Sequence, residues 1–183
     1  MDEQMFCYQC EQAAHGVGCT GRAGVCGKSA ETADAQDRLT GALIGFATLL
    51  LDIGKPIQPP QALLLLEGLF TTITNVNFNN ETILQIKNDI EKEKAAVSTT
   101  HFADYDMAEL WRAGEDVRSL KSLILFGLKG MAAYAYHASV LNYEDAEVNR
   151  FFCEALFKIG YEESAETLLP TVLKVGEINL KLS

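Results

Sequence analysis

Residues 148–159 read VNRFFCEALFKI, and their apolar side chains recur at helical intervals. The apolar positions lie three or four residues apart or adjacent: Val148, Phe151, Phe152, Ala155, Leu156 and Ile159. This spacing is typical of an amphipathic α-helix that buries one stripe of its surface. We expect Gly160 to end this helix. Cys153 lies on the apolar stripe, so we expect it to be a small buried core residue.

The same helical spacing continues on both sides of this stretch, from residue 29 to the end of the chain. Further helices are predicted from Ser29 to about residue 51, from Pro59, from Asn80 as N-cap, from Asp106, from about residue 115 to 141, and from Ser164 onward. Pro170 either lies near the true start of the last helix or kinks it. No segment alternates with a period of two, so the predicted fold class is all-α, with no sheet.

Between the helices, residues 99–105 have the character of a connector that joins two helical halves. One charged stretch, on the predicted helix after Asn80, is most simply a solvated face: Lys87, Glu91, Lys92, Glu93 and Lys94.

Composition and charge exclude several classes of protein. The chain has 183 residues, of which 48% are hydrophobic and 22% charged, which is ordinary for one substantial domain or two small ones. Fifteen Lys and Arg against 25 Asp and Glu give a formal net charge of −10, so we expect no nucleic-acid partner. The acidic start, residues 1–4, does not resemble a signal peptide, and the nearly apolar run at 39–51 is too short to span a bilayer. These features predict a cytoplasmic protein with no membrane partner.

Four of the five cysteines lie within the first 26 residues. Cys7, Cys10, Cys19 and Cys26 follow the pattern C-x2-C-x8-C-x6-C in a glycine-dense segment. Because nothing in the sequence suggests export, this clustering favours a metal site over disulfides. One C-x2-C pair followed by singly spaced cysteines favours an iron–sulfur cluster over zinc, which is usually held by two such pairs. Zinc and free redox thiols remain as alternatives.

No other motif carries recognisable chemistry. The chain has no G-x-G-x-x-G or Walker loop and no G-x-S-x-G elbow, so no catalytic residue is predicted. The three histidines, His15, His101 and His137, are too scattered to form a metal cage. We expect His15 to be an exposed loop residue and His137 to have a structural role in its helix.

Several segments, in order along the chain, resemble the hybrid cluster protein family, whose members are also called prismane proteins or hydroxylamine reductases. The matching segments are MFCYQCEQ at 5–12, GCT at 18–20, GVCGK at 24–28, AQD at 35–37, TITNVNF at 72–78, GLKGMAAY at 127–134 and GEINLK at 176–181. The resemblance therefore covers nearly the whole chain.

This resemblance implies the N-terminal domain of a longer family protein. Its expected organisation is a cysteine-rich loop at 1–28 followed by two three-helix bundles, at 29–98 and 99–183. The motif match implies that Cys7, Cys10, Cys19 and Cys26 ligate an iron–sulfur cluster. The x8 gap resembles the 4Fe–4S class, which we favour, whereas the x6 gap is closer to the 2Fe–2S class.

In the family, a separate hybrid cluster in two later α/β domains reduces hydroxylamine to ammonia and water, and these residues contain neither domain. The expected role is therefore electron relay, with two partners: the missing C-terminal α/β domains or an equivalent chain, and a redox donor protein. One alternative is a stand-alone helical protein with a structural zinc or iron–sulfur loop. Another is a sensor whose cluster responds to oxygen or nitric oxide.

Overall fold

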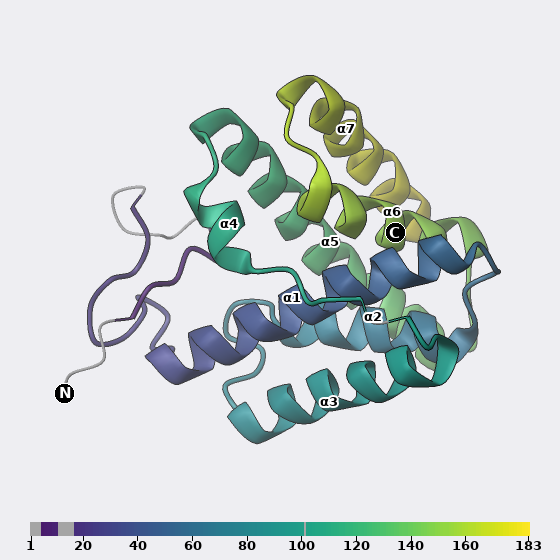
Figure 1. Cartoon of the computed structure of the whole chain (residues 1–183), viewed down its shortest axis with the longest axis horizontal. Helices are drawn as coiled ribbons and strands as arrows, with labels where there is room; N and C mark the ends of the chain where they lie inside the picture. Colours follow the sequence, from purple (N-terminus) through teal and green to yellow (C-terminus); the bar gives the residue numbers. More distant parts are fainter. Residues whose placement is uncertain (1–4, 11–16, 101) are drawn as a thin grey trace.

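The computed structural model describes residues 5–10, 17–100 and 102–183, and Figure 1 shows the seven α-helices within them. The helices are α1 (Ala30–Ile53), α2 (Pro59–Thr71), α3 (Asn80–Val97), α4 (Met107–Arg112), α5 (Glu115–Val140), α6 (Ala146–Tyr161) and α7 (Ala165–Leu182). In these ranges, β-type pairing is limited to two isolated bridges. The predicted all-α fold class is confirmed. None of the described helices is both long and apolar enough to cross a membrane.

Polar side chains fix where most helices begin. Ser29, Asn79, Asp106, Asp145 and Ser164 each accept a hydrogen bond from a backbone N–H of the first turn of the following helix. Such caps satisfy donors that have no partner inside the helix.

The predicted cap of α3 was wrong by one residue. Asn79 accepts from Glu81 N and Thr82 N, whereas Asn80 is the first helical residue. The Asn80 side chain instead accepts a hydrogen bond from Thr32 Oγ1 at 2.8 Å. Asn80 thereby ties the start of α3 to α1, which is a tertiary role.

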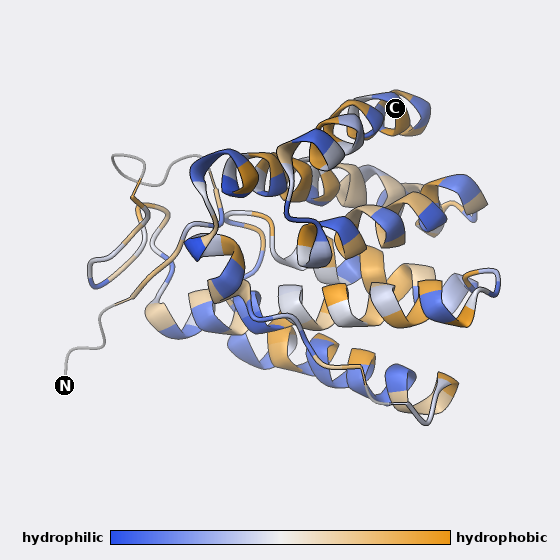
Figure 2. Ribbon diagram, turned by 45° about the horizontal axis from the view of Figure 1, so that its top comes forward, coloured by the Kyte–Doolittle hydropathy of each residue, from blue (hydrophilic) through white to orange (hydrophobic). Residues whose placement is uncertain are grey.

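Helix α1 lies at the centre of the core. It packs against α2, α3 and α6, while α5 packs against α2, α6 and α7. Buried side chains from α1 to α7 form one continuous cluster, in which Leu39, Leu43 and Phe46 are fully buried. In Figure 2 the outer side of α3 is largely hydrophilic, as expected for a helix at the edge of this core. The division into two bundles at residue 98 stays a prediction. Helices on both sides of residue 98 contribute side chains to the same core cluster, so the core does not separate the two parts.

The connector before α4 crosses α1 at close range. Tyr105 N donates to Gly41 O at 3.1 Å, and one turn along α1 Gly45 faces the carbonyl of Ala103. A Cβ added at Gly45 would lie 2.6 Å from Ala103 O. The two glycines therefore allow backbone to approach backbone.

Lys94 corrects the prediction of a solvated face on α3. It is buried, and its Nζ lies 2.8 Å from Asp104 Oδ1 and 3.3 Å from Glu91 Oε1. Lys87 also pairs with Asp104, at 3.1 Å. Burying Lys94 is tolerated because these carboxylates compensate its charge. The ion pairs hold the connector against α3.

Gly160 also has a role other than the predicted one. Helix α6 continues through it to Tyr161, so Gly160 does not end the helix. A Cβ added at Gly160 would lie 2.7 Å from Ile44 Cγ2 of α1, which shows that the glycine allows close packing of α6 on α1. The prediction for Cys153 is confirmed: it is fully buried, and burial raises the pKa of its thiol to about 12.

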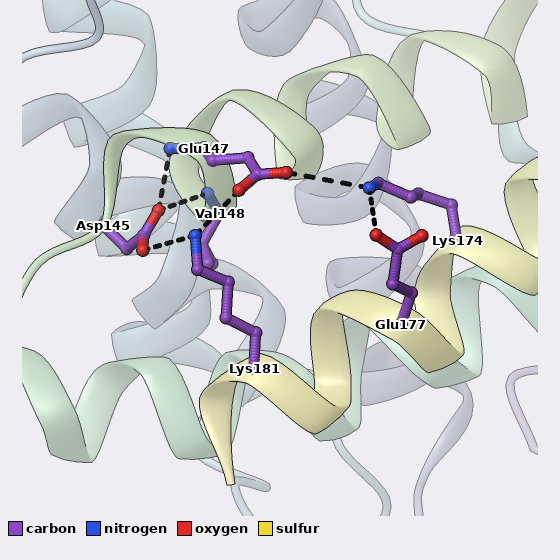
Figure 3. Close-up of polar contacts among 6 residues, drawn as sticks. All are labelled: Asp145, Glu147, Val148, Lys174, Glu177 and Lys181. Atoms are coloured by element: carbon purple, nitrogen blue, oxygen red, sulfur yellow. Dashed lines mark hydrogen bonds and ion pairs between the residues drawn. The ribbon is translucent and has the colours of Figure 1, made fainter.

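Charged side chains join α7 to the start of α6, as Figure 3 shows. Lys181 Nζ lies 2.7 Å from both Asp145 Oδ2 and Glu147 Oε2. Lys174 bridges Glu147, at 3.6 Å, and Glu177, at 2.7 Å. Exposed pairs of this kind contribute little to stability, so this cluster sets orientation more than stability. Pro170 lies inside α7, which begins at Ala165 after its cap.

Candidate metal centre

Two of the four N-terminal cysteines face each other across a short antiparallel pairing. Cys7 N donates to Cys19 O at 3.0 Å, and Cys19 N donates to Cys7 O at 2.8 Å. Residues opposite each other in such a pairing project their side chains to the same face. Gly18 takes a φ of +89°, and a Cβ added there would lie 3.0 Å from Cys7 O. Glycine is therefore required beside this pairing.

A second turn positions Cys26. Gly24 N donates to Lys28 O at 2.8 Å, and Gly27 N donates to Gly24 O at 2.8 Å. Gly27 has a φ of +86°, a conformation that residues with side chains rarely adopt. The turn brings the chain round Cys26 just before Ser29 caps α1.

The four cysteines line one cavity of about 330 Å³. Its other lining residues come from the same segment and from the α2–α3 turn: Gln9, Gly24, Val25, Lys28, Thr74 and Asn75. All four thiols are free. Figure 1 shows this N-terminal segment at the end of the helical body where α1 begins, beside α4. Among the described residues, no three His, Cys, Asp or Glu side chains gather closely enough to hold a single metal ion.

Lys28 brings a buried positive charge to this cavity. Its side chain is only 2% exposed, and its Nζ donates to Gln9 Oε1 at 2.7 Å and to Gln36 Oε1. Gln36 Nε2 in turn donates to Asn77 O, at 3.0 Å. Burial raises the pKa of the Cys7 thiol, and the Lys28 charge acts in the opposite direction. Lys28 therefore favours the thiolate, which is the form of cysteine that binds metals.

Gln9 links Lys28 to a carboxyl on α1. Its Nε2 donates to Asp37 Oδ1 at 2.7 Å and to Ala33 O at 3.0 Å. Burial raises the pKa of Asp37 to about 6, although Gln9 and the nearby charge of Lys129 act to lower it. Asp37, Gln9 and Lys28 thus form one continuous chain of hydrogen-bonded side chains.

A second buried lysine lies near the same group. Lys129, on α5, donates to Thr72 O at 3.2 Å. Burial, and secondly the charge of Lys28, lowers its pKa to about 8, while Asp37 and Cys7 act to raise it. Lys28 lines the cysteine cavity, and Lys129 lies close enough to interact electrostatically with Cys7 and Cys10. Two buried ammonium groups can therefore offset part of the negative charge that thiolates bring to a metal centre.

On its other side, Asp37 lines a groove of about 890 Å³. Met5, Phe6, Asp34, Arg38, Tyr105 and Trp111 are among its other lining residues. The indole Nε1 of Trp111 is buried and makes no hydrogen bond within the described part of the chain. It lies near enough to Asp37 to favour the carboxylate, but outside hydrogen-bonding geometry. The groove gives Asp37 access to solvent.

The sequence singled out the four cysteines, which stay a prediction as ligands, but not the polar residues behind them. Gln9, Lys28, Gln36, Asp37 and Lys129 lie inside the segments that carry the family resemblance, without a predicted role. The sequence did contain a signal for Lys129, because it is a single charged residue within an apolar stretch of its helix. Of the histidines, His137 packs on the rings of Phe70 and Tyr136, and His15 and His101 lie outside the described residues.

The raised pKa of Asp37 predicts a pH dependence of stability in the metal-free chain. Between about pH 4, near its ordinary pKa, and about pH 6, the folded state binds more protons at this carboxyl than the unfolded state does. The contribution of Asp37 to the free energy of unfolding is therefore full below this window and is lost as the pH rises through it. Urea unfolding from pH 4 to 7 measures the loss.

The comparison that isolates Asp37 uses two variants. In Asp37→Asn this part of the pH dependence should vanish, because the amide cannot titrate but keeps an oxygen for Gln9. Asp34→Asn is the matched control, since Asp34 is an exposed carboxylate on the same helix, paired with Arg38 at 2.9 Å. Parallel pH profiles for wild type and Asp37→Asn would contradict the prediction.

Comparison with known proteins places this chain in a family. A sequence model of the Prismane/CO dehydrogenase family matches residues 5–183. A hydroxylamine reductase of Thermoanaerobacter pseudethanolicus is 40% identical over 94% of this chain and 37% of its own length. One of Desulfovibrio desulfuricans is 37% identical over 98% of this chain and 37% of its own length. The chain thus spans little more than a third of these curated relatives. It belongs to the Prismane/CO dehydrogenase family, as its resemblance to hybrid cluster proteins predicted.

Proposed function

We propose that this chain is an iron–sulfur electron-transfer domain of a hydroxylamine reductase-like hybrid cluster protein. The observation that carries the proposal is that Cys7, Cys10, Cys19 and Cys26 line a single cavity. Membership of a family whose proteins bind iron–sulfur clusters supports a cofactor of this kind. We propose these four residues as its ligands.

The size of the cavity favours a cluster over zinc. A zinc ion lies about 2.3 Å from each thiolate sulfur, so four sulfurs around it enclose almost no space. A hollow of about 330 Å³ that the cysteines line together with neighbouring residues accommodates a polynuclear centre more readily. We favour 4Fe–4S, with 2Fe–2S as the alternative class.

The surrounding residues suit a centre that changes charge. A bound iron–sulfur cluster accepts and releases one electron, at a potential set by its charge, hydrogen bonds and exposure. The four thiolates would hold it, and the buried ammonium of Lys28 would offset part of their negative charge. The polar side chains Gln9 and Gln36 hold that ammonium in place.

The reduction of hydroxylamine, implied by the names of the relatives, is proposed only for a longer assembly. The relatives are nearly three times as long as the part matched here, and the proposed relay would pass electrons to that additional polypeptide or an equivalent chain. A redox donor protein would supply the electrons. We place this system in the cytoplasm, where thiols remain reduced.

Metal analysis tests the proposal directly. The chain is purified without oxygen, and its iron, sulfide and zinc are measured together with its visible spectrum and its EPR spectrum after dithionite. About four irons and four sulfides per chain, with absorbance that bleaches on reduction, are expected for 4Fe–4S. Two irons would indicate the 2Fe–2S class.

Two other outcomes would overturn the electron-transfer role. Zinc without sulfide, in protein never exposed to air, would leave a structural metal loop. A cluster that disassembles on each reduction or on exposure to nitric oxide, instead of cycling reversibly, would favour a sensor.

A further inference from the structure

A chain of three hydrogen-bonded side chains joins the cysteine cavity to the groove that the start of α1 forms with the connector and α4. Lys28 and Gln9 line the cavity, and Asp37 lines the groove. The links are Lys28 Nζ to Gln9 Oε1, at 2.7 Å, and Gln9 Nε2 to Asp37 Oδ1, at 2.7 Å. Each member thus contacts the next, and the Asp37 end is open to solvent.

We propose that Asp37 is a proton-binding site coupled to reduction of the cluster. When the cluster gains one electron from a one-electron donor, the Asp37 carboxylate binds one proton from water in the groove and becomes a neutral carboxylic acid. Oxidation of the cluster returns the electron to an acceptor and the proton to the groove. The negative charge added to the cluster is therefore accompanied by one positive charge, the proton added to Asp37. This inference rests on the proposed electron-transfer function.

The direction of the coupling follows from electrostatics. Reduction makes the thiolate centre more negative, and added negative charge nearby disfavours a second anion. The hydrogen-bonded chain keeps Asp37 close to that centre through Gln9 and Lys28, which both line the cysteine cavity. Burial has already raised the pKa of Asp37 to about 6 in the metal-free chain. A further rise in this pKa on reduction would bring it through neutral pH.

Other charged groups face Asp37 from each neighbouring element. Lys28 and Cys7 come from the N-terminal segment, Lys129 from α5, and Asp34 and Arg38 from its own helix. The groove also presents Glu31, Asp104, Tyr105 and Asp106. All of these groups remain in an Asp37→Asn variant. Their contributions to the pH dependence therefore cancel when this variant is compared with the wild type.

The test is the midpoint potential of the loaded chain, measured by anaerobic dye-mediated titration from pH 5 to 9. Where one proton accompanies one electron, the reduction equilibrium changes tenfold per pH unit, which is about 59 mV. The potential of the wild type should fall as the pH rises in the window that Asp37 governs. Asp37→Asn should remove this slope, and Asp34→Asn should retain it.

An infrared measurement on the unaltered protein gives a second readout. The reduced-minus-oxidised difference spectrum near pH 7 should contain a carbonyl band of a protonated carboxyl group, which shifts in D₂O. The same band should be absent from Asp37→Asn. This readout reports the carboxyl group itself and does not depend on enzymatic activity.

The outcomes separate this inference from the function on which it rests. A reversible cluster whose potential does not depend on pH, or whose slope persists in Asp37→Asn, would overturn the coupling and leave the relay intact. A chain that binds no iron would overturn both. If Asp37→Asn fails to fold, the infrared band of the wild type decides: its absence overturns the coupling, and its presence supports it.

Discussion

Replacement of Gly41 by alanine is expected to lower the free energy of unfolding by about 3 kcal/mol, the upper part of the range for overpacking a tight contact. The Cβ of the new residue would collide with the carbonyl oxygen of Tyr105, which is backbone and cannot rotate away. The connector would have to move off α1, and the hydrogen bond from Tyr105 N to Gly41 O, at 3.1 Å, would be lost. Thermal or urea unfolding of the metal-free chain measures the change.

Displacement of the connector has a second consequence. Asp104, which precedes Tyr105, holds the buried Lys94 and the partly buried Lys87 of α3. Without this carboxylate, the ion pairs of Lys94 within the described part of the chain would be reduced to the longer contact with Glu91. An uncompensated buried charge is costly, so the loss at Gly41 is expected to exceed the loss from a steric clash with a flexible side chain.

Gly130→Ala is the matched control. Gly130 also lies inside a helix, α5, but is exposed, and an added Cβ would meet nothing within 4 Å. Alanine there should stabilise the chain by up to about 1 kcal/mol, the difference in helix propensity. Equal effects at Gly41 and Gly130 would show that the connector does not restrict Gly41 as the structure indicates.

The second large effect is expected at the cysteines. Cys19→Ser should reduce bound iron and sulfide at least tenfold, since even residues behind metal ligands change affinity about 10- to 100-fold. The backbone hydrogen bonds between Cys7 and Cys19 do not involve side chains, so the short antiparallel pairing can persist. Iron and sulfide analysis with circular dichroism distinguishes the loss of the cluster from the loss of the fold.

Cys153→Ala serves as the control for this experiment. Cys153 is fully buried in α6 and belongs to the main core cluster rather than to the cysteine cavity. The variant should keep its full iron content and lose a little stability because a small void remains. Iron retained by Cys19→Ser, or lost from Cys153→Ala, would contradict the ligand assignment.

The structure supports the predictions that depend on the residues of a single short segment. The stripe from Val148 to Ile159 and the helix starts at Ser29, Asp106 and Ser164 depend only on neighbours within a turn or two. Periodicity and capping chemistry act over that range. The four-cysteine pattern is likewise readable along the chain, because its spacing is a property of one segment.

The errors concern residues whose roles depend on distant partners. Asn80 binds Thr32, 48 residues earlier, and Lys94 is buried because Asp104 faces it. Gly160 resembles a helix stop in sequence, yet it allows α6 to approach Ile44. Nothing within a single turn of helix distinguishes these roles from a cap, a solvated charge or a terminator.

The sequence by itself therefore determined the helices, most of their starts and the spacing of the cysteines. Tertiary structure alone decided what surrounds the cysteines, because Lys28, Gln9 and Asp37 meet only when the N-terminal segment folds onto α1. Lys129 joins them from α5, about a hundred residues further along the chain. Hydrogen bonds and charges act through space, so this polar group is specified by packing and by no local pattern.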